Sequence, residues 1–341
     1  MFYFGGLIMK EREVWVDNVK VIACVLVVLG HFFQSMTKAN ILPANALYQW
    51  FNQTIYYFHV PLFFICSGYL YQNFFRVHSL RNWGAHVLNK FISLGIPYFI
   101  FSIVTLILKK LFEGSVNTPG AGFLETLFFN PIAPYWYLYV LFFIFLVTPT
   151  FNSKKNMIIA LIVALIMKAI IIAAGDISLP YLLDRLLNNQ IWFVAGMCMK
   201  TFKWNEKLNA KTSLLGVLFL VLSIYIYNLN ISFKGMGFLL GVMACISVIS
   251  IIYYIFRENK QNKMFGILAK YTLPIFVMHT IFAAGFRSIL LKLGVSSTIM
   301  HVTLGLIVSF VLPIIAAWIM SKTKFSDALL YPGKYIRIKI K

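Results

Sequence analysis

The stretch "DNVKVIACVLVVLGH", residues 17–31, decides the fold. It is a strongly apolar run, yet it opens on Asp17 and Lys20 and closes on His31. Apolar runs of about 20 residues, without alternation of polar and apolar positions, recur along the chain and have the length of a membrane span. Backbone groups in lipid have no water to bond to, so such runs must form helices. The sequence therefore predicts an all-α polytopic membrane protein.

Composition supports the same class. The 341 residues are 60% hydrophobic and 12% charged, whereas soluble domains are about half apolar and about a quarter charged. The net charge of +20 does not indicate nucleic-acid binding, because the basic residues lie in short loops between apolar runs, as membrane topology requires. The four cysteines lie inside apolar runs without metal-type spacing, so we interpret them as small buried hydrophobes.

We predict ten membrane-spanning helices. Their expected ranges are 18–37, 53–73, 88–110, 135–152, 156–174, 187–202, 212–230, 236–256, 271–291 and 300–320. With the N-terminus in the cytoplasm, 21 basic residues fall on the inner side and six on the outer side. The six outer residues are Lys38, Lys109, Lys110, Arg185, Lys234 and Lys292. This bias predicts that both termini are cytoplasmic.

The expected organisation is one transmembrane domain, residues 15–321, between two short segments. Residues 1–14 form an N-terminal cytoplasmic or interfacial segment, in which Met9 is an alternative start. Residues 322–341 form a basic cytoplasmic tail. No cleavable signal peptide is expected, because the first basic residues follow the short apolar stretch at the N-terminus.

The polar residues of the opening stretch share one side of a helix. Lys20 and His31 are eleven residues apart, so they face the same way about 16 Å apart along the axis, and Asp17 lies on the same side, about 40° from His31. Asp17 and Lys20 could simply extend toward the membrane surface. His31 lies deeper, and an ionisable group inside the membrane is a candidate functional residue.

The second span, "YYFHVPLFFICSGYLYQ" (residues 56–72), supplies a second buried imidazole, His59. A neutral histidine satisfied by a neighbour is the alternative interpretation. Ser67 and Gly68 follow in the inner half of the span. Such small residues often only allow two helices to approach closely.

These two stretches resemble the acyltransferase 3 superfamily of integral membrane acyltransferases. The resemblance is closest to the branch of fucose 4-O-acetylase-like and polysaccharide O-acetyltransferase proteins, whose first helix has the pattern D-x-x-K-G-x-x-I-x-x-V-V-x-G-H. Asp17, Lys20 and "VVLGH" (27–31) match that pattern, and "FHVPLFFICSGYLY" (58–71) matches the second helix. "PYWYLYVLFF" (134–143), "IWFVAGM" (191–197) and "YTLPIFVMH" (271–279) resemble later family blocks.

The departures from the family pattern are specific. The wider superfamily usually has Arg at the position of Lys20, and Lys keeps the charge but loses the bidentate fork. Val21 stands where the branch often has Gly. The R-x-x-R pattern before the third helix is not intact, although Arg76, Arg81 and Lys90 supply charge there.

The resemblance implies transfer of an acyl group, usually acetyl, from cytoplasmic acyl-CoA to a hydroxyl of a cell-surface or lipid-linked glycan. Acetyl-CoA is then a co-substrate, and no tightly bound cofactor or metal is expected. An acceptor hydroxyl needs a base of near-neutral pKa, which histidine provides. We therefore expect His31 to be catalytic, as a general base or as the carrier of the acyl group. Asp17 and Lys20 are expected at the thioester.

The remaining candidate residues are assigned by their side of the membrane. The donor is an anion, so the inner cations Arg76, Arg81 and Lys90 are the expected donor-binding residues. The candidates for acceptor binding or support are His59, Ser67, Arg185 and His279. Arg185 could equally form an ordinary ion pair with Asp184. Tyr135, Trp136 and Tyr137 fit an aromatic belt at the membrane surface better than a sugar-stacking site.

Two other functions fit a polar path through a membrane. A transporter or flippase of a lipid-linked saccharide would also need polar groups in mid-membrane, but it should distribute them between two repeats. A non-catalytic scaffold of glycan assembly would not need His31. The sequence favours an enzyme, because the polar residues gather in spans one, two and nine and in an inner basic loop. The expected location is the plasma membrane of a bacterial cell.

Overall fold

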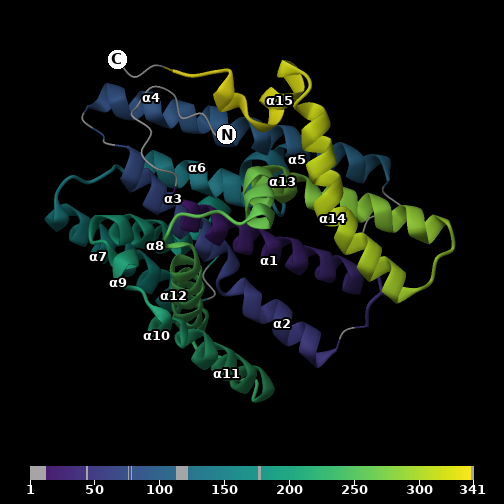
Figure 1. Ribbon diagram of the computed structural model, residues 1–341, viewed down its shortest axis with the longest axis horizontal. Helices are drawn as coiled ribbons and strands as arrows, with labels where there is room; N and C mark the ends of the chain where they lie inside the picture. The colour runs from purple at the N-terminus through teal and green to yellow at the C-terminus, as the bar shows by residue number, and fades with distance from the viewer. Residues whose placement is uncertain are drawn as a thin grey trace. The chain divides into compact units, whose positions relative to one another are not determined.

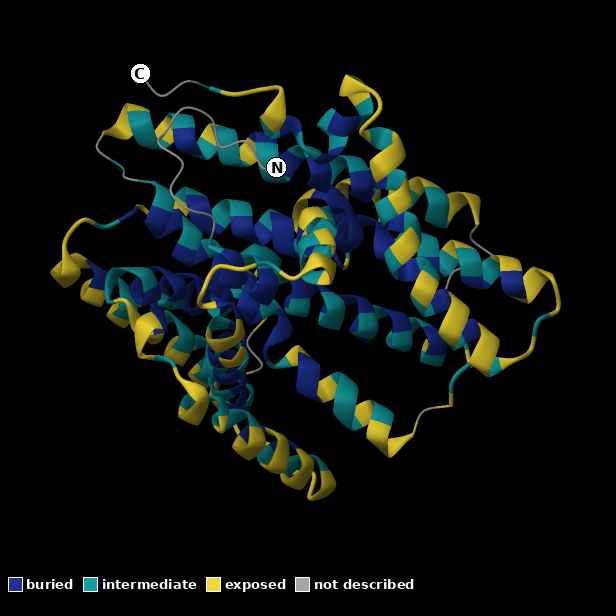
Figure 2. Ribbon diagram, viewed as in Figure 1, coloured by how far each residue is buried: buried dark blue, intermediate teal, exposed yellow. Residues whose placement is uncertain are grey.

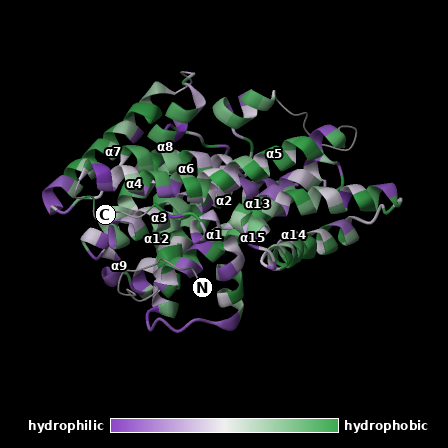
Figure 3. Ribbon diagram, turned by 90° about the horizontal axis from the view of Figure 1, so that it is seen from above, coloured by the Kyte–Doolittle hydropathy of each residue, from purple (hydrophilic) through white to green (hydrophobic). Residues whose placement is uncertain are grey.

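The computed structural model describes residues 13–43, 45–75, 77, 79–112, 122–175 and 178–338. All regular secondary structure in these residues is helical, and no strand forms among them. Figure 1 shows the helices in chain order, and Figure 3 shows that most of them carry mainly hydrophobic residues. The all-α class predicted from the sequence is confirmed.

Seven helical segments of the described chain are long and apolar enough to cross a membrane. They are α1 (Val14–Lys38), α4 to α5 (Leu80–Leu111), α7 (Lys154–Ala174), α10 to α11 (Ala210–Asn228), α12 (Met236–Phe256), α13 (Lys263–Lys292) and α14 (Thr298–Met320). The second segment consists of α4 (Leu80–Lys90), the π-helical turn η1 (Phe91–Gly95) and α5 (Ile96–Leu111), and the fourth of α10 (Ala210–Ser213) and α11 (Leu215–Asn228). Each segment overlaps one predicted span.

The other three predicted spans overlap shorter or more polar helices. These are α2 (Ala46–Tyr56) and α3 (His59–Phe74) for 53–73, α6 (Trp136–Val147) for 135–152, and α8 (Tyr181–Thr201) for 187–202. The range 53–73 is therefore not one helix, because the chain breaks between α2 and α3. Pro61 lacks a backbone N–H and is best tolerated in a first turn, so the helix that contains it begins at His59. The count of ten spans stays a prediction.

Short elements complete the described chain. They are η3 (Glu125–Phe129), α9 (Trp204–Lys207), α15 (Lys324–Leu330) and η4 (Pro332–Lys334). The helices fall into two compact units. The first unit comprises Met1–Ala23, Ala46–His78 and Val147–Lys270, and the second comprises Cys24–Asn45, Ser79–Leu146 and Tyr271–Lys341.

In the first unit, α3 and α8 pack with their backbones in contact. A Cβ atom on Gly68 would overlap the carbonyl oxygen of Phe193, and a Cβ on Gly196 would overlap that of Ile65. Because the pairing runs 65 with 196 and 68 with 193, the two helices are antiparallel. This contact supports the close-approach interpretation of Gly68 and leaves no room for a larger residue.

In the second unit, α1 and α13 run parallel with a constant offset. The Cys24 thiol donates to the carbonyl of Thr272 at 3.6 Å, and the ring of His31 lies beside that of His279. Each pair is separated by 248 positions. Helix α14 runs the other way, because the Thr298 hydroxyl donates to the carbonyl of Ile41 at 2.9 Å while Gly305 faces the Phe32 ring. The contact between α1 and α13 is called the seam below. A buried cluster lies at this seam and consists of Phe32, Met36 and Ala283.

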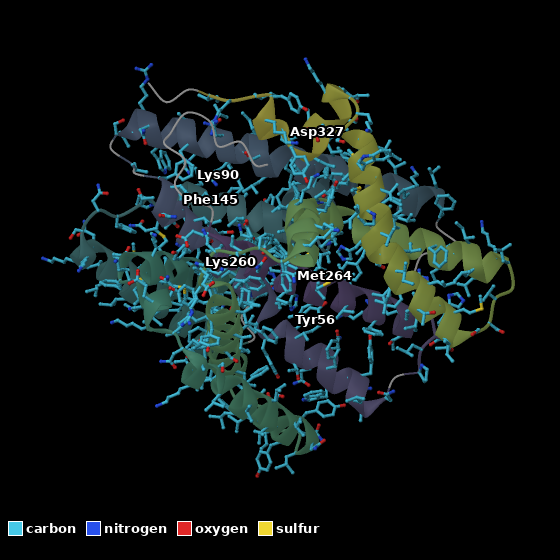
Figure 4. The ribbon with its side chains drawn as sticks, viewed as in Figure 1. Tyr56, Lys90, Phe145, Lys260, Met264 and Asp327 are labelled. Atoms are coloured by element: carbon cyan, nitrogen blue, oxygen red, sulfur yellow. The ribbon has the colours of Figure 1, made fainter. Side chains whose placement is uncertain are left out.

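The C-terminal residues of the second unit are folded. Asn89 of α4 donates to the carbonyl of Ile338 at 2.9 Å and accepts from its N–H at 2.9 Å. Asp327, labelled in Figure 4, accepts from Lys334 at 2.9 Å and from the Tyr335 hydroxyl at 2.8 Å. The hydrogen bond to Asp327 raises the pKa of Tyr335. The predicted tail therefore includes a helix and fixed contacts.

Large apolar side chains are exposed along several helices. Figure 2 shows exposed residues along α14, and they include Ile299, Ile307 and Trp318. Helix α7 of the first unit likewise exposes Ile162 and Ile166. In water such surfaces would favour aggregation, whereas contact with lipid removes the free-energy cost of exposing them.

Candidate active site

Two histidines from different helices meet in the second unit. His31 of α1 and His279 of α13 have ring centroids 5.6 Å apart, with ring planes inclined by 35°. The parallel packing of α1 and α13 places the two residues at the same level of the seam. His279 is buried, whereas His31 is partly accessible. Two residues that the sequence singled out separately thus form a pair.

The hydrogen bonds of His279 determine its tautomer. Its Nδ1 lies 2.9 Å from the carbonyl oxygen of Ile275 and 3.0 Å from that of Phe276. Carbonyl oxygens only accept, so Nδ1 carries the proton and Nε2 of the neutral ring carries a lone pair. Nε2 is buried without a hydrogen-bond partner among the described residues. A buried acceptor of this kind is available for binding or for proton transfer.

Tyr135 supports α13 next to this pair. Its side chain is fully buried, and its hydroxyl donates to the carbonyl of Val277 at 3.0 Å. The same hydroxyl lies 2.7 Å from the Thr105 hydroxyl on α5. Tyr135 is therefore packed inside the second unit and not exposed to lipid, and its place in an aromatic belt at the membrane surface stays a prediction. Sequence alone could not separate the two cases, since the partners are distant along the chain.

Arg287 lies farther along the same seam. Its side chain is only 3% exposed, and its Nη1 donates to both the hydroxyl and the carbonyl of Ser35, one turn beyond His31. Arg287 is not among the expected site residues, although an arginine within a predicted span is a recognisable signal.

Asp17 and Lys20 belong to the first unit, and both are half-buried on α1. Helix α3 packs against this part of α1, since the Cys66 thiol donates to the carbonyl of Val16 at 3.8 Å. The expected helix across residues 17–31 is confirmed by α1. The expected catalytic roles of Asp17 and Lys20 stay predictions.

A further acid, which the sequence analysis missed, lies just before α1. Glu13 accepts from the Trp15 indole at 2.9 Å and from the Tyr69 hydroxyl at 3.1 Å. Its carboxylate also lies 3.5 Å from the Lys200 ammonium. No local pattern marks Glu13, because Tyr69 and Lys200 come from α3 and α8.

His59, Ser67 and Arg185 also lie in the first unit. His59 is buried, and its Nδ1 donates to the carbonyl of Ile55 at 2.6 Å, which fits the alternative of a histidine satisfied by its surroundings. Ser67 is half-buried on α3. Arg185 lies 3.8 Å from Asp184 and stacks over the Tyr181 ring at 5.2 Å. The ion pair that was one alternative for Arg185 is therefore present.

Two of the three expected donor-binding cations lie on a helix and not in a loop. Arg81 and Lys90 lie on helix α4 of the second unit. They are nine residues apart, so they point to opposite sides of that helix. Arg81 is exposed, whereas the Lys90 ammonium lies 4.2 Å from the centre of the Phe145 ring (Figure 4). Arg76 lies outside the described residues.

Comparison with known proteins identifies the family. A family model described as an acyltransferase domain matches residues 13–318. The chain belongs to this acyltransferase family. The match includes both histidines of the pair and confirms the resemblance to the acyltransferase 3 superfamily.

A curated relative covers a smaller region. Nodulation protein NolL of Sinorhizobium fredii (strain NBRC 101917 / NGR234) is 33% identical over 148 residues, which are 42% of this chain and 38% of the relative. The chain thus matches well under half of that protein's length. No solved structure matches the chain.

Proposed function

We propose that the protein is a membrane O-acetyltransferase that moves an acetyl group from acetyl-CoA to a hydroxyl of a cell-surface or lipid-linked glycan. Membership of the acyltransferase family supports the acyl transfer. The observation that carries the proposal is the pair formed by His31 and the unpartnered Nε2 of His279. Neutral imidazoles are suited to accept the proton of a sugar hydroxyl near neutral pH.

In this mechanism His31 is the general base. One of its ring nitrogens takes the proton of the acceptor hydroxyl while the hydroxyl oxygen attacks the thioester carbonyl. The new C–O ester bond forms, the C–S bond breaks, and the coenzyme A thiolate receives the proton from His31. Atoms and charge therefore balance without a metal or a redox partner.

His279 acts through His31. Its Nε2 lone pair can accept the second N–H of His31, directly or through one water, because the rings are 5.6 Å apart. That contact would orient His31 and stabilise the imidazolium, as the third group of a catalytic triad does. The two backbone carbonyls keep His279 in the tautomer that this role needs. Transfer through an acyl group on His31 is the alternative route.

The donor and the location follow from the charge pattern. Acetyl-CoA is a polyanion, and the residues predicted to face the cytoplasm include Arg76, Arg81 and Lys90. Asp17 and Lys20 would meet the donor where it enters at the inner end of α1, and its thioester arm would extend from there along α1 to His31. We place the protein in the plasma membrane of a bacterial cell, with the glycan acceptor on the outer side.

The direct test compares surface glycan from cells with and without the gene. The proposal predicts O-acetyl esters that are present only with the gene and that mild alkali removes. A matched strain carrying His31→Gln should resemble the deletion strain while it makes normal amounts of protein. Glycan that is absent from the surface altogether would instead favour a flippase. Normal acetylation in the His31→Gln strain would favour a scaffold.

A further inference from the structure

Arg287 is a buried cation without a described acid to neutralise it. Its only described hydrogen bonds go to Ser35, through the hydroxyl and the carbonyl, and neither acceptor carries a charge. The described acids of the second unit are Glu125 and Asp327. Glu125 accepts from Asn130 and Asp327 from Lys334 and Tyr335. A buried charge of this kind is costly and calls for a counter-ion.

The parallel packing of α1 against α13 places this guanidinium near the histidine pair. Ser35 is one turn beyond His31 on α1, so the guanidinium lies about 6 Å farther along the helix axis than His31. Arg287 itself is eight residues beyond His279 on α13. Its side chain can return toward Ser35 because helical side chains lean toward the N-terminus. The distance is comparable to one sugar ring, so a single acceptor could contact both His31 and Arg287.

The same end of the second unit gathers other cations. Helices α1, α5 and α13 carry Lys38, Lys109, Lys110 and Lys292 in their last turns. Lys109 is close enough to Lys38 for their charges to interact, and Lys292 lies 5.9 Å from the centre of the Phe112 ring on the segment after α5. These lysines are four of the six basic residues that the charge pattern predicts outside.

Helix dipoles account for the lysines but not for the arginine. A cation in the last turn of a helix is stabilised by the C-terminal dipole. Arg287, however, lies five residues before the end of α13 and is buried. Outer cations are also the exception to the positive-inside pattern, so a group of them next to a buried guanidinium indicates a bound anion.

We propose that Arg287, oriented by Ser35, binds an anionic group of the acceptor, a carboxylate or a phosphate, one turn beyond the His31–His279 pair. This inference rests on the proposed function and specifies its acceptor class. The N–H groups of the guanidinium that do not reach Ser35 match the two oxygens of a carboxylate or phosphate. The lysines at the helix ends attract the same anion at longer range.

The test uses purified full-length protein with acceptor glycan extracted from the cell surface. The acceptor is supplied in three forms: untreated, with its carboxylates reduced to alcohols, and with its lipid phosphate removed. For the wild type, one treatment should raise the acceptor KM, and which one does so identifies the anion as carboxylate or phosphate. Arg287→Gln should raise the KM for untreated acceptor about tenfold to a hundredfold, the range of one lost charge-assisted contact. It should leave the KM for the sensitive treated form unchanged.

Controls separate this inference from folding and from the proposed function. Lys234→Gln removes a predicted outer cation of the first unit and should leave every KM unchanged, and Arg287→Lys should recover part of the lost affinity. The KM for acetyl-CoA should not move in any variant. A wild type insensitive to both treatments, or an Arg287→Gln loss equal for all three acceptors, would overturn the inference. A wild type that acetylates none of the three would overturn the proposed function instead.

Discussion

At the scale of single residues, the account depends on the nitrogen atoms of His279. Two carbonyl acceptors fix the proton on Nδ1, so Nε2 is the only atom of the ring that can accept a proton from His31. A structural histidine would need only Nδ1. The two roles therefore assign different nitrogens of the same ring, and substitutions can separate them.

His279→Asn tests this distinction. The asparagine amide can still donate to the carbonyl of Ile275, because it occupies the place of Nδ1, but it has no counterpart of Nε2. We expect a melting temperature close to that of the wild type and a rate of acetyl transfer lower by about 10²-fold or more. Turnover at saturating acetyl-CoA, together with thermal unfolding in detergent, measures both effects. Wild-type turnover in His279→Asn would show that the residue is structural.

At the scale of helices, the glycines of α3 and α8 explain why these elements pack closely enough to touch. Neither Gly68 nor Gly196 can accept a Cβ without moving a backbone. Helix α3 is only 16 residues long and contains Pro61 in its first turn, so we expect its stability to depend on this tight contact. Small residues are the usual means of such packing in membranes.

Gly68→Ala should therefore destabilise the protein, by about 1–3 kcal/mol as for other overpacked sites. Gly84→Ala is the matched control, because a Cβ at Gly84 of α4 meets nothing within 4 Å. There alanine should be neutral or slightly stabilising, since it favours helix more than glycine does. Thermal unfolding of the two variants in the same detergent compares them. Equal melting temperatures would mean that α3 and α8 are not in backbone contact.

The helices themselves were largely predictable from apolar runs. Spans such as 156–174 and 236–256 coincide with α7 and α12 nearly to the residue. The break before His59 was missed because apolar residues continue across it. Pairings between distant residues, such as His31 with His279 or Tyr135 with Val277, could not be read from the sequence. They depend on which helix faces come together, and a single sequence does not specify that.

At the scale of the whole molecule, the direction of α13 constrains the number of membrane crossings. Four of the seven long apolar segments lie between α1 and α13 in the chain. Four crossings would make α13 antiparallel to α1, yet the pairs at positions 24 with 272 and 31 with 279 require parallel helices. If all seven long segments cross the membrane, an odd number of the shorter helices α3, α6 and α8 must cross as well. The ten-span prediction, in which all three cross, meets this condition.

Cysteine labelling tests the predicted orientation. The four native cysteines are buried, so a membrane-impermeant maleimide should report only an introduced cysteine. The exposed residues Lys207, at the end of α9, and Lys234, in the loop before α12, lie on either side of the segment formed by α10 and α11. Lys234→Cys should react in intact cells, and Lys207→Cys should react only after permeabilisation, because the basic bias places the loop of Lys207 inside. The reverse result would invert the topology, and identical labelling would remove α11 as a span.

The central claim is that His31 is the base for acetyl transfer. Its most direct test is the initial rate of transfer from labelled acetyl-CoA to surface glycan by purified wild type and His31→Gln. The account predicts a rate lower by about 10²–10⁴-fold in His31→Gln, at an unchanged melting temperature and with an unchanged KM for acetyl-CoA. Transfer by His31→Gln at the wild-type rate would contradict it.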